Sequence, residues 1–281
     1  MSIKRRFAIG SHEGRLLTEL ERQGIAVFSK QKHRTLLRDF GDQQLADAIH
    51  RLVAKGWLLN IERGKYVVVP RAARASWHEH PFVIASGIAP NEHYISYWSA
   101  LSFHGLTEQI PRVVYVAVRH KQKKPVSFQG VDYRFISLSD EKFFGFRDEE
   151  FMALNGAATV HVPVAEPEKA VIDALDDESL AGGIPEIAKA VRRGLEDEIL
   201  SGERLLEYGE KYPHSAVAAR LGYLLDIIGV EELTKLAERI RRRGPHILLS
   251  PKTECKGATV NSKWHIRVNV PEELLIAGEE A

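Results

Sequence analysis

Polar and cationic side chains between residues 30 and 65 form a pattern that suits nucleic-acid recognition. Two glutamines, an aspartate and an arginine recur on one side of a helical pattern between residues 42 and 55. Glutamine amides pair with adenine, and guanidinium groups pair with guanine, when a helix enters the major groove of DNA. The candidate DNA-binding residues are Lys30, Lys32, Arg34, Gln43, Gln44, Asp47, Arg51, Arg63, Gly64 and Lys65.

These residues have different predicted roles. The cations at 30–34 begin a predicted helix, where cations and free amide groups together suit a phosphate. Gly64 permits a tight turn, which would bring its two cationic neighbours to an adjacent groove or phosphate. Asp47 is anionic and would repel phosphates. We therefore expect Asp47 to orient Arg51, which lies four residues later on the same helix.

A predicted helix at 42–55 would present the two glutamines and the arginine. Asp42 can cap the start of this helix, and Gly56 suits its end. The apolar residues follow helical spacing and define the side that is predicted to be buried. They are Leu45, Ile49, Leu52 and Val53.

Further elements surround this helix in the order of a winged helix-turn-helix. They are predicted helices at 11–23 and 29–40 and predicted strands at 57–61 and 66–69. In such proteins the last helix before the hairpin enters the major groove, and the preceding helix crosses the DNA backbone. Residues 1–75 are therefore predicted to form a winged helix-turn-helix DNA-binding domain. A winged helix used only for protein contacts is the alternative interpretation.

The distribution of charge favours DNA. Residues 1–75 contain 15 Lys and Arg against 7 Asp and Glu, a formal charge of +8, whereas the whole chain carries +1. The residues after 75 therefore carry −7. This asymmetry indicates a polyanion-binding part joined to a part with a different role. A solvated basic surface without a partner would give the same charge count.

The composition excludes several classes of protein. Hydrophobic residues make up 44% and charged residues 27% of the chain, as in globular proteins. The single cysteine, Cys255, permits no internal disulfide and predicts a reducing compartment. No apolar run reaches the length of a membrane span, and the first residues lack the apolar core of a secretory signal. We expect a cytoplasmic protein without a membrane partner.

The rest of the chain predicts a second, larger domain. The segment at 76–90 is predicted to be a linker. Apolar or alternating stretches at 113–118, 131–136 and 264–270 predict strands, and helical patterns are interleaved with them in irregular order. The predicted fold class is α+β, with the winged helix-turn-helix followed by a mixed α/β domain at 91–281. The strand order does not follow from the sequence.

Five motifs, in order, resemble the AbiEi family of antitoxin-type transcriptional regulators. The first, LADAIHRLVAKGWLLNIERGKYVVVP, lies in the predicted winged helix. The others are NEHYISYWSALSFHGL from residue 91, VPVAEPEKAVIDAL at 162–175, SAVAARLGYLLDIIG at 215–229 and NSKWHIRVNVP at 261–271. Their order along nearly the whole chain is the specific part of the resemblance.

The resemblance implies a regulator that represses its own bicistronic toxin–antitoxin operon by binding inverted repeats in operator DNA. It further implies that the second domain counteracts a nucleotidyltransferase-type toxin of a type IV system used in phage defence. Such an antidote need not form a stable complex with the toxin, so a direct complex stays open. The alternative is a stand-alone winged-helix transcription factor whose second domain binds a small ligand or mediates assembly.

An enzymatic role has only one candidate set of residues. The sequence contains no nucleotide-binding glycine motif, no nucleophile elbow and no His-Glu-x-x-His, and its histidines lack metal-ligand spacing. Asp132 together with Asp140, Glu141 and Lys142 could bind magnesium in a DNA nuclease. Such sets arise by chance in a charge-rich chain. We therefore predict no enzyme, no catalytic residue, no metal and no cofactor.

Three further charged features have a structural and a functional interpretation. Lys169 and Asp173 are four residues apart on a predicted helix and are predicted to form a surface ion pair. The run RHKQKKP at 119–125 is either a solvated loop or a contact for an acidic protein or RNA. The run RIRRRG at 239–244 is predicted to complement the dipole of a helix at 230–243, with a second nucleic-acid patch as the alternative.

Overall fold

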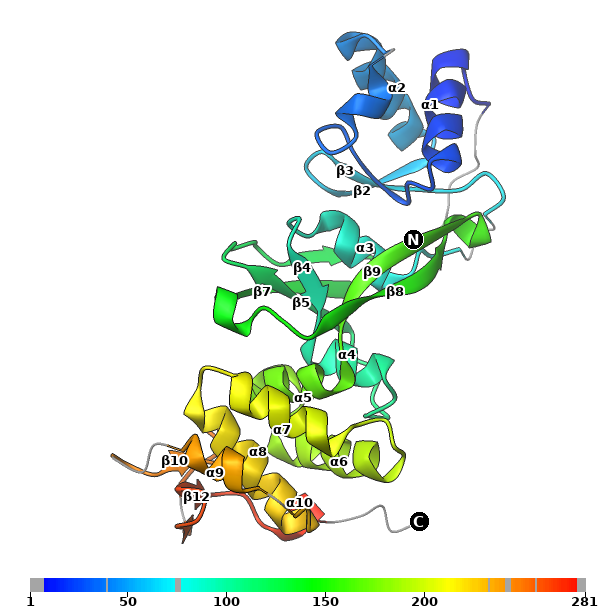
Figure 1. Ribbon diagram of the computed structural model, residues 1–281. Coiled ribbons are helices and arrows are strands. Elements are labelled where there is room, and N and C mark those ends of the chain that lie inside the picture. Colours follow the sequence, from blue (N-terminus) through cyan, green and yellow to red (C-terminus); the bar gives the residue numbers. More distant parts are fainter. Residues whose placement is uncertain are drawn as a thin grey trace. The chain divides into compact units, whose positions relative to one another are not determined.

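The computed structural model describes residues 8–38, 40–73, 77–231, 233–240, 244–255 and 257–276. The chain divides into two units. Unit 1 comprises the residues up to Tyr94 with Arg112–Phe135 and Asp148–Pro163, and unit 2 comprises Ile95–Pro111, Ile136–Arg147 and the residues from Val164 on. Helices and sheets both contribute (Figure 1), which confirms the predicted mixture of α and β structure.

The N-terminal part of unit 1 combines two α-helices with a small sheet. Its elements are α1 (Ser11–Arg22), β1 (Val27–Ser29), a 3₁₀ helix (Arg34–Leu37), α2 (Asp42–Ala54), β2 (Leu58–Glu62) and β3 (Lys65–Val68). The strand order is β1-β3-β2, and β3 is antiparallel to both neighbours. Gly64 has φ +76° in the turn between β2 and β3, which glycine adopts at little cost.

The first and third predicted helices and the hairpin are confirmed, whereas the predicted helix at 29–40 is wrong. Ser29 ends strand β1, where it pairs with Lys65, and among the described residues of this stretch, 29–38 and 40, only the four of the 3₁₀ helix are helical. Strand pairing with β3 provides hydrogen bonds that a helix beginning at Ser29 would lose. Asp42 was predicted to cap α2, but it is the first residue of the helix, and Gly41 occupies the N-cap position.

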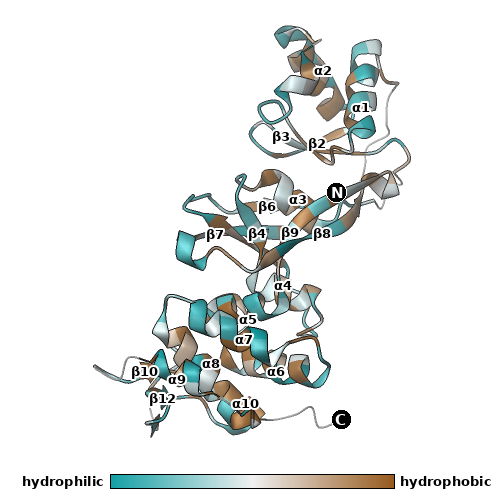
Figure 2. Ribbon diagram, viewed as in Figure 1, coloured by the Kyte–Doolittle hydropathy of each residue, from teal (hydrophilic) through white to brown (hydrophobic). Residues whose placement is uncertain are grey.

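Apolar faces of α1 and α2 form the core of this part. The predicted residues Leu16, Leu17 and Leu20 of α1 are buried, as are Leu45, Ile49 and Leu52 of α2. Each such side chain contributes about 1.5–3 kcal/mol when it leaves water. The opposite side of α2 is coloured hydrophilic in Figure 2, so the helix presents its polar residues to solvent.

The remainder of unit 1 contains most of a six-stranded sheet with the strand order β6-β7-β5-β4-β9-β8, and the ends of four of its strands are assigned to unit 2. The strands are β4 (His93–Ile95), β5 (Val113–Arg119), β6 (Val126–Phe128), β7 (Val131–Leu138), β8 (Phe146–Ala153) and β9 (Ala158–Ala165). Helix α3 (Pro81–Ile88) precedes them and contacts both β5 and β1. A 3₁₀ helix, Leu154–Gly156, connects β8 to β9.

The predicted linker at 76–90 therefore contains a packed helix. Val83, Ile84, Ala85 and Ile88 of α3 are buried. A Cβ atom at Gly87 would overlap the side chain of Val27, so α3 and β1 approach more closely than any larger residue permits. This contact joins the N-terminal part to the sheet, and unit 1 extends beyond the predicted boundary at residue 75.

Unit 2 is mainly helical. Its α-helices are α4 (Tyr97–Phe103), α5 (Pro167–Asp176), α6 (Ile184–Glu196), α7 (Gly202–Lys211), α8 (Ser215–Ile228), α9 (Thr234–Glu238) and α10 (Glu273–Ile276). Two 3₁₀ helices, Asp140–Lys142 and Glu178–Leu180, and a three-stranded sheet of β10 (Ile247–Leu248), β12 (Ile266–Val268) and β11 (Thr259–Asn261) complete it. Hydrophobic residues run along α8 in Figure 2, and its residues 217–225 are buried.

Two predicted elements of unit 2 are shorter than expected. The predicted helix at 230–243 is α9, and the arginines at 241–243 lie outside the described residues. The predicted strand at 264–270 is β12, because Trp264 and His265 belong to a turn. None of the helices in the described ranges combines the length and the hydropathy that a membrane span requires.

We expect Gly87→Ala to lower the free energy of unfolding by about 1–3 kcal/mol, because the added methyl group overpacks the contact with Val27. Urea unfolding followed by tryptophan fluorescence measures this loss. Gly202→Ala is the matched control, since a Cβ atom there meets nothing within 4 Å. Equal stability of the two variants would contradict the close approach of α3 and β1.

Candidate nucleic-acid interface

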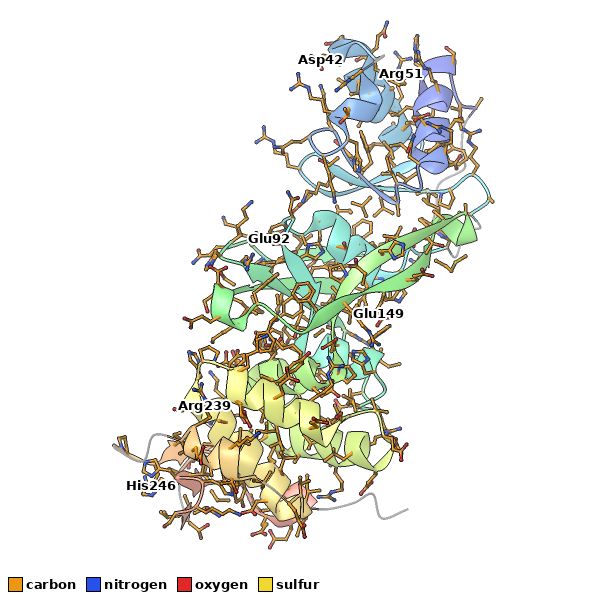
Figure 3. All side chains as sticks on the ribbon, in the orientation of Figure 1. Asp42, Arg51, Glu92, Glu149, Arg239 and His246 are labelled. Atoms are coloured by element: carbon orange, nitrogen blue, oxygen red, sulfur yellow. The ribbon has the colours of Figure 1, made fainter. Side chains whose placement is uncertain are left out.

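Helix α2 presents the predicted base-reading residues to solvent. Gln43, Gln44, Asp47 and Arg51 all have exposed side chains, because the buried side of the helix is occupied by the apolar residues described above. Asp42 and Arg51, labelled in Figure 3, mark the beginning and the last turn of this helix. The two glutamines lie in its first turn, the end that helix-turn-helix proteins direct at bases.

The polar residues of α2 are paired differently from the prediction. Asp47 accepts a hydrogen bond from Nε2 of Gln43 at 3.1 Å, and Nη1 of Arg51 lies 3.9 Å from Oε1 of Glu13 on α1. Glu13 is buried, and burial alone would raise its pKa. Hydrogen bonds from Lys55 and from the Gly10 amide lower the pKa of Glu13 below its ordinary value. The buried carboxylate is therefore charged, and it attracts Arg51 away from Asp47.

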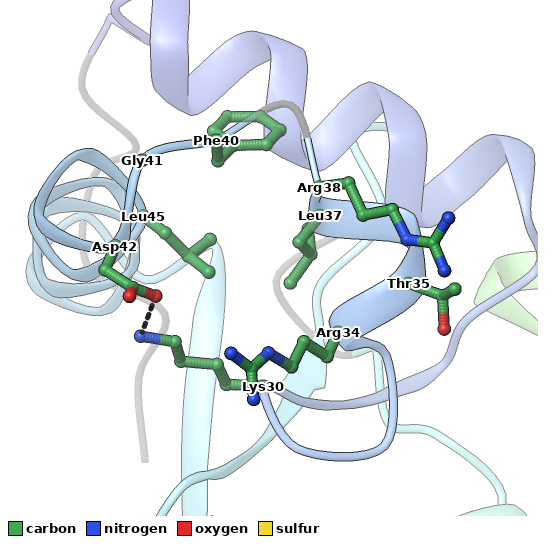
Figure 4. Close-up of a pocket in the computed structure, with 9 residues that line it drawn as sticks. All are labelled: Lys30, Arg34, Thr35, Leu37, Arg38, Phe40, Gly41, Asp42 and Leu45. Atoms are coloured by element: carbon green, nitrogen blue, oxygen red, sulfur yellow. Dashed lines mark ion pairs between the residues drawn. The ribbon is translucent and has the colours of Figure 1, made fainter.

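A cavity of about 600 Å³ lies beside the first turn of α2. Its lining comes from the segment that leads from β1 through the 3₁₀ helix into α2 (Figure 4). The lining residues are Lys30, Arg34, Thr35, Leu37, Arg38, Phe40, Gly41, Asp42 and Leu45. Three of them are cations and one is an acid, so the cavity is suited to an anion.

The charges of the cavity are partly compensated. Nζ of Lys30 lies 3.1 Å from Oδ1 of Asp42 (Figure 4). The hydrogen bond from Lys30 and the charges of Lys30 and Arg34 lower the pKa of Asp42. Both side chains of this pair are largely exposed, so a phosphate can displace it at small cost. The amide groups of the first turn of α2 are directed out of the same end of the helix.

The turn between β2 and β3 places only one of its two cations in solvent. Arg63 is exposed at the tip, whereas the side chain of Lys65 is 25% exposed. Nζ of Lys65 donates to the carbonyl oxygen of Ile88 at 2.6 Å and lies 3.0 Å from Oε1 of Glu62. Lys65 thus differs from the predicted solvent-facing phosphate contact, since α3 and Glu62 already occupy its ammonium group.

Glu62 connects the hairpin to the six-stranded sheet. Its Oε2 atom lies 2.6 Å from Nζ of Lys123, which belongs to the basic run at 119–125. Burial alone would raise the pKa of Glu62, but hydrogen bonds from Lys123 and Lys65 lower it. Burial lowers the pKa of Lys65, and its pair with Glu62 opposes that shift.

The nuclease-like carboxylates belong to different units, Asp132 to unit 1 and Asp140 and Glu141 to unit 2. Asp132 accepts a hydrogen bond from Ser127, its neighbour across the β6–β7 hairpin. Asp140, Glu141 and Lys142 form a 3₁₀ helix in unit 2, and Lys142 pairs with Asp176 at 2.6 Å. Within the described ranges, no group of three or more His, Cys, Asp and Glu residues could bind a metal ion. Cys255 is an exposed free thiol.

The prediction of a surface ion pair between Lys169 and Asp173 is wrong. Both side chains are 0% exposed, and they pair with each other inside unit 2. Oγ of Ser96 donates to Oδ2 of Asp173 at 2.6 Å, and Nζ of Lys169 lies over the Phe144 and Tyr212 rings, 4.9 and 5.5 Å from their centroids. Burial lowers the pKa of Lys169, and Asp173 opposes that effect. A substrate cannot reach these fully enclosed groups, so we interpret them as structural.

Two cations near the candidate interface were not predicted from the sequence. Arg38 lines the cavity, and Lys123 joins Glu62. Arg38 follows Arg34 by four residues, and this spacing could have indicated that the two side chains lie on the same side of the chain. The contact of Lys123 with Glu62 joins residues 61 positions apart and leaves no local signal.

Comparisons with known proteins establish the fold only. No family model matches the chain, and no curated protein matches it. Among solved structures, the crystal structure of the RV2827C protein from Mycobacterium tuberculosis is similar, with a TM-score of 0.65 and 17% sequence identity. The alignment covers 98% of this chain and 96% of that chain, so the similarity extends through both units.

We expect Lys169→Met to lower the free energy of unfolding by about 3–5 kcal/mol, because it leaves Asp173 buried without a countercharge. The double variant Lys169→Met/Asp173→Leu should recover much of this loss. Urea unfolding measures both. Lys263→Met, which removes an exposed pair with Asp226, is the control and should cost at most about 1 kcal/mol. Similar losses for Lys169→Met and Lys263→Met would contradict the enclosed pair.

Proposed function

We propose that the chain is a DNA-binding transcriptional regulator whose N-terminal part is a winged helix-turn-helix. One observation carries the proposal: α2 has exposed amides in its first turn, directly beside a cavity with three cationic side chains. The order of α1, the 3₁₀ helix, α2 and the β2–β3 hairpin supports it. The second helix of this motif would then be reduced to the 3₁₀ helix.

The cavity and α2 would act on different parts of the DNA. A backbone phosphate would enter the cavity, replace Asp42 as the partner of Lys30, and meet Arg34, Arg38 and the free amides of α2. This contact would fix the register of the helix on the duplex. Gln44 and its neighbours would then reach the base edges, which carry the sequence information.

The β2–β3 hairpin would contribute fewer phosphate contacts to DNA binding than a hairpin with two solvent-exposed cations. Lys65 is engaged by Glu62 and by the Ile88 carbonyl oxygen, which leaves Arg63 as the exposed cation at the tip. A DNA target agrees with the reducing compartment that the lone cysteine predicts. The proposal assigns no catalytic step and requires no metal or cofactor.

We further propose, from the AbiEi resemblance, that the DNA target is an operator with inverted repeats and that unit 2 counteracts a nucleotidyltransferase-type toxin. The motifs of the resemblance support the architecture of unit 2, because Ser96 bonds Asp173, Arg220 donates to the Leu175 carbonyl oxygen, and Trp264 donates to Asp226. Co-expression with a nucleotidyltransferase encoded beside this gene tests the antidote role. Failure to restore growth would favour the alternative, a stand-alone transcription factor whose second domain binds a small ligand or mediates assembly.

We expect two sets of variants to separate base reading from phosphate binding. Gln44→Ala should cost about 1–3 kcal/mol on DNA from upstream of its own gene and little on random DNA. Arg34→Ala/Arg38→Ala should weaken binding to both DNAs and flatten the slope of log affinity against log salt by about 0.9 per lost contact. Fluorescence anisotropy with labelled duplexes measures both effects.

Gln23→Ala is the matched control, because Gln23 is an exposed glutamine at the end of α1. It should bind both DNAs like the wild type. Equal weakening of Gln44→Ala on both DNAs would contradict base reading by α2. Absence of DNA binding by the wild-type chain would contradict the proposed function itself.

A further inference from the structure

The basic run at 119–125 is a fixed loop beside the β2–β3 hairpin. It connects β5 to β6, and two of its residues are anchored within unit 1. Nη1 of Arg119 lies 2.6 Å from Oε1 of Glu92 (labelled in Figure 3), and Lys123 pairs with Glu62. Nζ of Lys123 also lies 5.0 Å from the centroid of the Phe135 ring. The loop is therefore positioned by the sheet and by the hairpin together.

Lys121 and Lys124 are the exposed cations of this loop. Their side chains are in solvent, on either side of the anchored Lys123. Neither of them forms an ion pair with another residue that the structure describes. Contacts hold the loop at Arg119 and at Lys123, so phosphate binding by Lys121 and Lys124 requires little further ordering of the backbone, and its entropic cost falls on the two lysine side chains.

Glu62 connects this loop to the β2–β3 hairpin of the candidate interface. Its carboxylate lies 3.0 Å from Nζ of Lys65 and 2.6 Å from Nζ of Lys123, so these two lysines from two chain segments are neighbours, and strands β2 and β6 are in contact. Lys32 lies in the turn between β1 and the 3₁₀ helix, two residues before Arg34 of the cavity. The nearby acids Glu62 and Glu92 are already paired with cations.

We propose that loop 120–124 is a second DNA-backbone contact, in which Lys121 and Lys124 bind phosphates of duplex DNA flanking the base pairs read by α2. Together with Arg63 of the adjoining hairpin, they would extend the cationic surface of the N-terminal part to the six-stranded sheet. The inference rests on the proposed function. The two lysines would supply phosphate contacts in place of Lys65, which is engaged by Glu62 and by the Ile88 carbonyl oxygen.

The composition of the loop favours a duplex backbone over the other polyanions. Proteins that bind single-stranded RNA or DNA stack successive bases on several aromatic side chains, whereas RHKQKKP contains no Phe, Tyr or Trp and only one ring, that of His120. Lysine is a compact point charge that binds phosphate without reading sequence. The attachment of the loop to the hairpin that carries the exposed Arg63 favours DNA over an acidic protein.

The test is the salt dependence of binding to a random-sequence duplex of about three helical turns, each of about 10 base pairs. For Lys121→Ala/Lys124→Ala, we expect the slope of log affinity against log salt to flatten by about 1.8, which is about 0.9 for each of two phosphate contacts. The preference for DNA from upstream of its own gene over random DNA should stay unchanged. Circular dichroism and thermal unfolding should match the wild type, since both side chains are exposed.

Lys189→Ala/Lys235→Ala is the matched control, because it removes two exposed lysines of unit 2 and changes the net charge equally. An unchanged slope for the loop variant, while Arg34→Ala/Arg38→Ala flattens it, would overturn the inference and leave the proposed function standing. If the control flattened the slope equally, the effect would come from net charge alone, and the inference would be overturned. Loss of single-stranded RNA binding with intact duplex binding would make the loop an RNA contact instead. No DNA binding by the wild type would overturn both proposals.

Discussion

Helix α5 is enclosed within unit 2 and yet carries two opposite charges, and this constraint organises the helices around it. A buried ion costs several kcal/mol unless it is paired and its remaining polar atoms are hydrogen-bonded. Lys169 and Asp173 meet that requirement through each other, through Ser96 at the start of α4, and through the Phe144 and Tyr212 rings. The neighbouring helices also bond to α5, since Arg220 of α8 donates to its Leu175 carbonyl oxygen. Each of these partners fixes the position of the element that supplies it.

Unit 1 depends on a comparable but less enclosed contact. Glu62 pairs with both Lys65 and Lys123, and these pairs connect the hairpin to the six-stranded sheet. The close approach of Gly87 in α3 to Val27 in β1 adds an apolar contact. Releasing Lys65 to a phosphate would leave the half-buried Glu62 with one partner fewer. The proposed winged helix would therefore keep its hairpin on the sheet. Phosphate binding would then depend on the cavity beside α2 and on cations of the sheet itself.

The sequence predicted those features of the fold that local periodicity determines. Helices α1 and α2 follow from the spacing of Leu16, Leu20, Leu45 and Leu52, and the hairpin follows from the turn at Gly64. Features that depend on distant residues were not predictable in the same way. Ser29 forms a strand because Lys65 pairs with it, and Arg51 turns toward a buried acid on α1 rather than toward Asp47.

The same limit explains the misjudged charges. An i, i+4 pair of opposite charges gives the same sequence pattern on a surface and in a core, so only the surrounding helices reveal that Lys169 and Asp173 are buried. Among the candidate interface residues, spacing placed those of α2 on the exposed side of the helix, but it missed Arg38 of the cavity and gave Lys65 the wrong surroundings.

The motifs that carry the AbiEi resemblance are largely interior. Hydrogen bonds join the segments of these motifs: Ser96 donates to Asp173, Arg220 to the Leu175 carbonyl oxygen, and Trp264 to Asp226. Gly222 lies so close to the Trp264 ring that a Cβ atom there would overlap it. Such residues specify how unit 2 packs, because replacing any of them leaves a buried polar group unpaired or a ring displaced. A toxin-directed function of unit 2 would therefore depend on exposed residues between the motifs, which a family resemblance does not identify. The proposed DNA-directed function would instead depend on the exposed residues of α2.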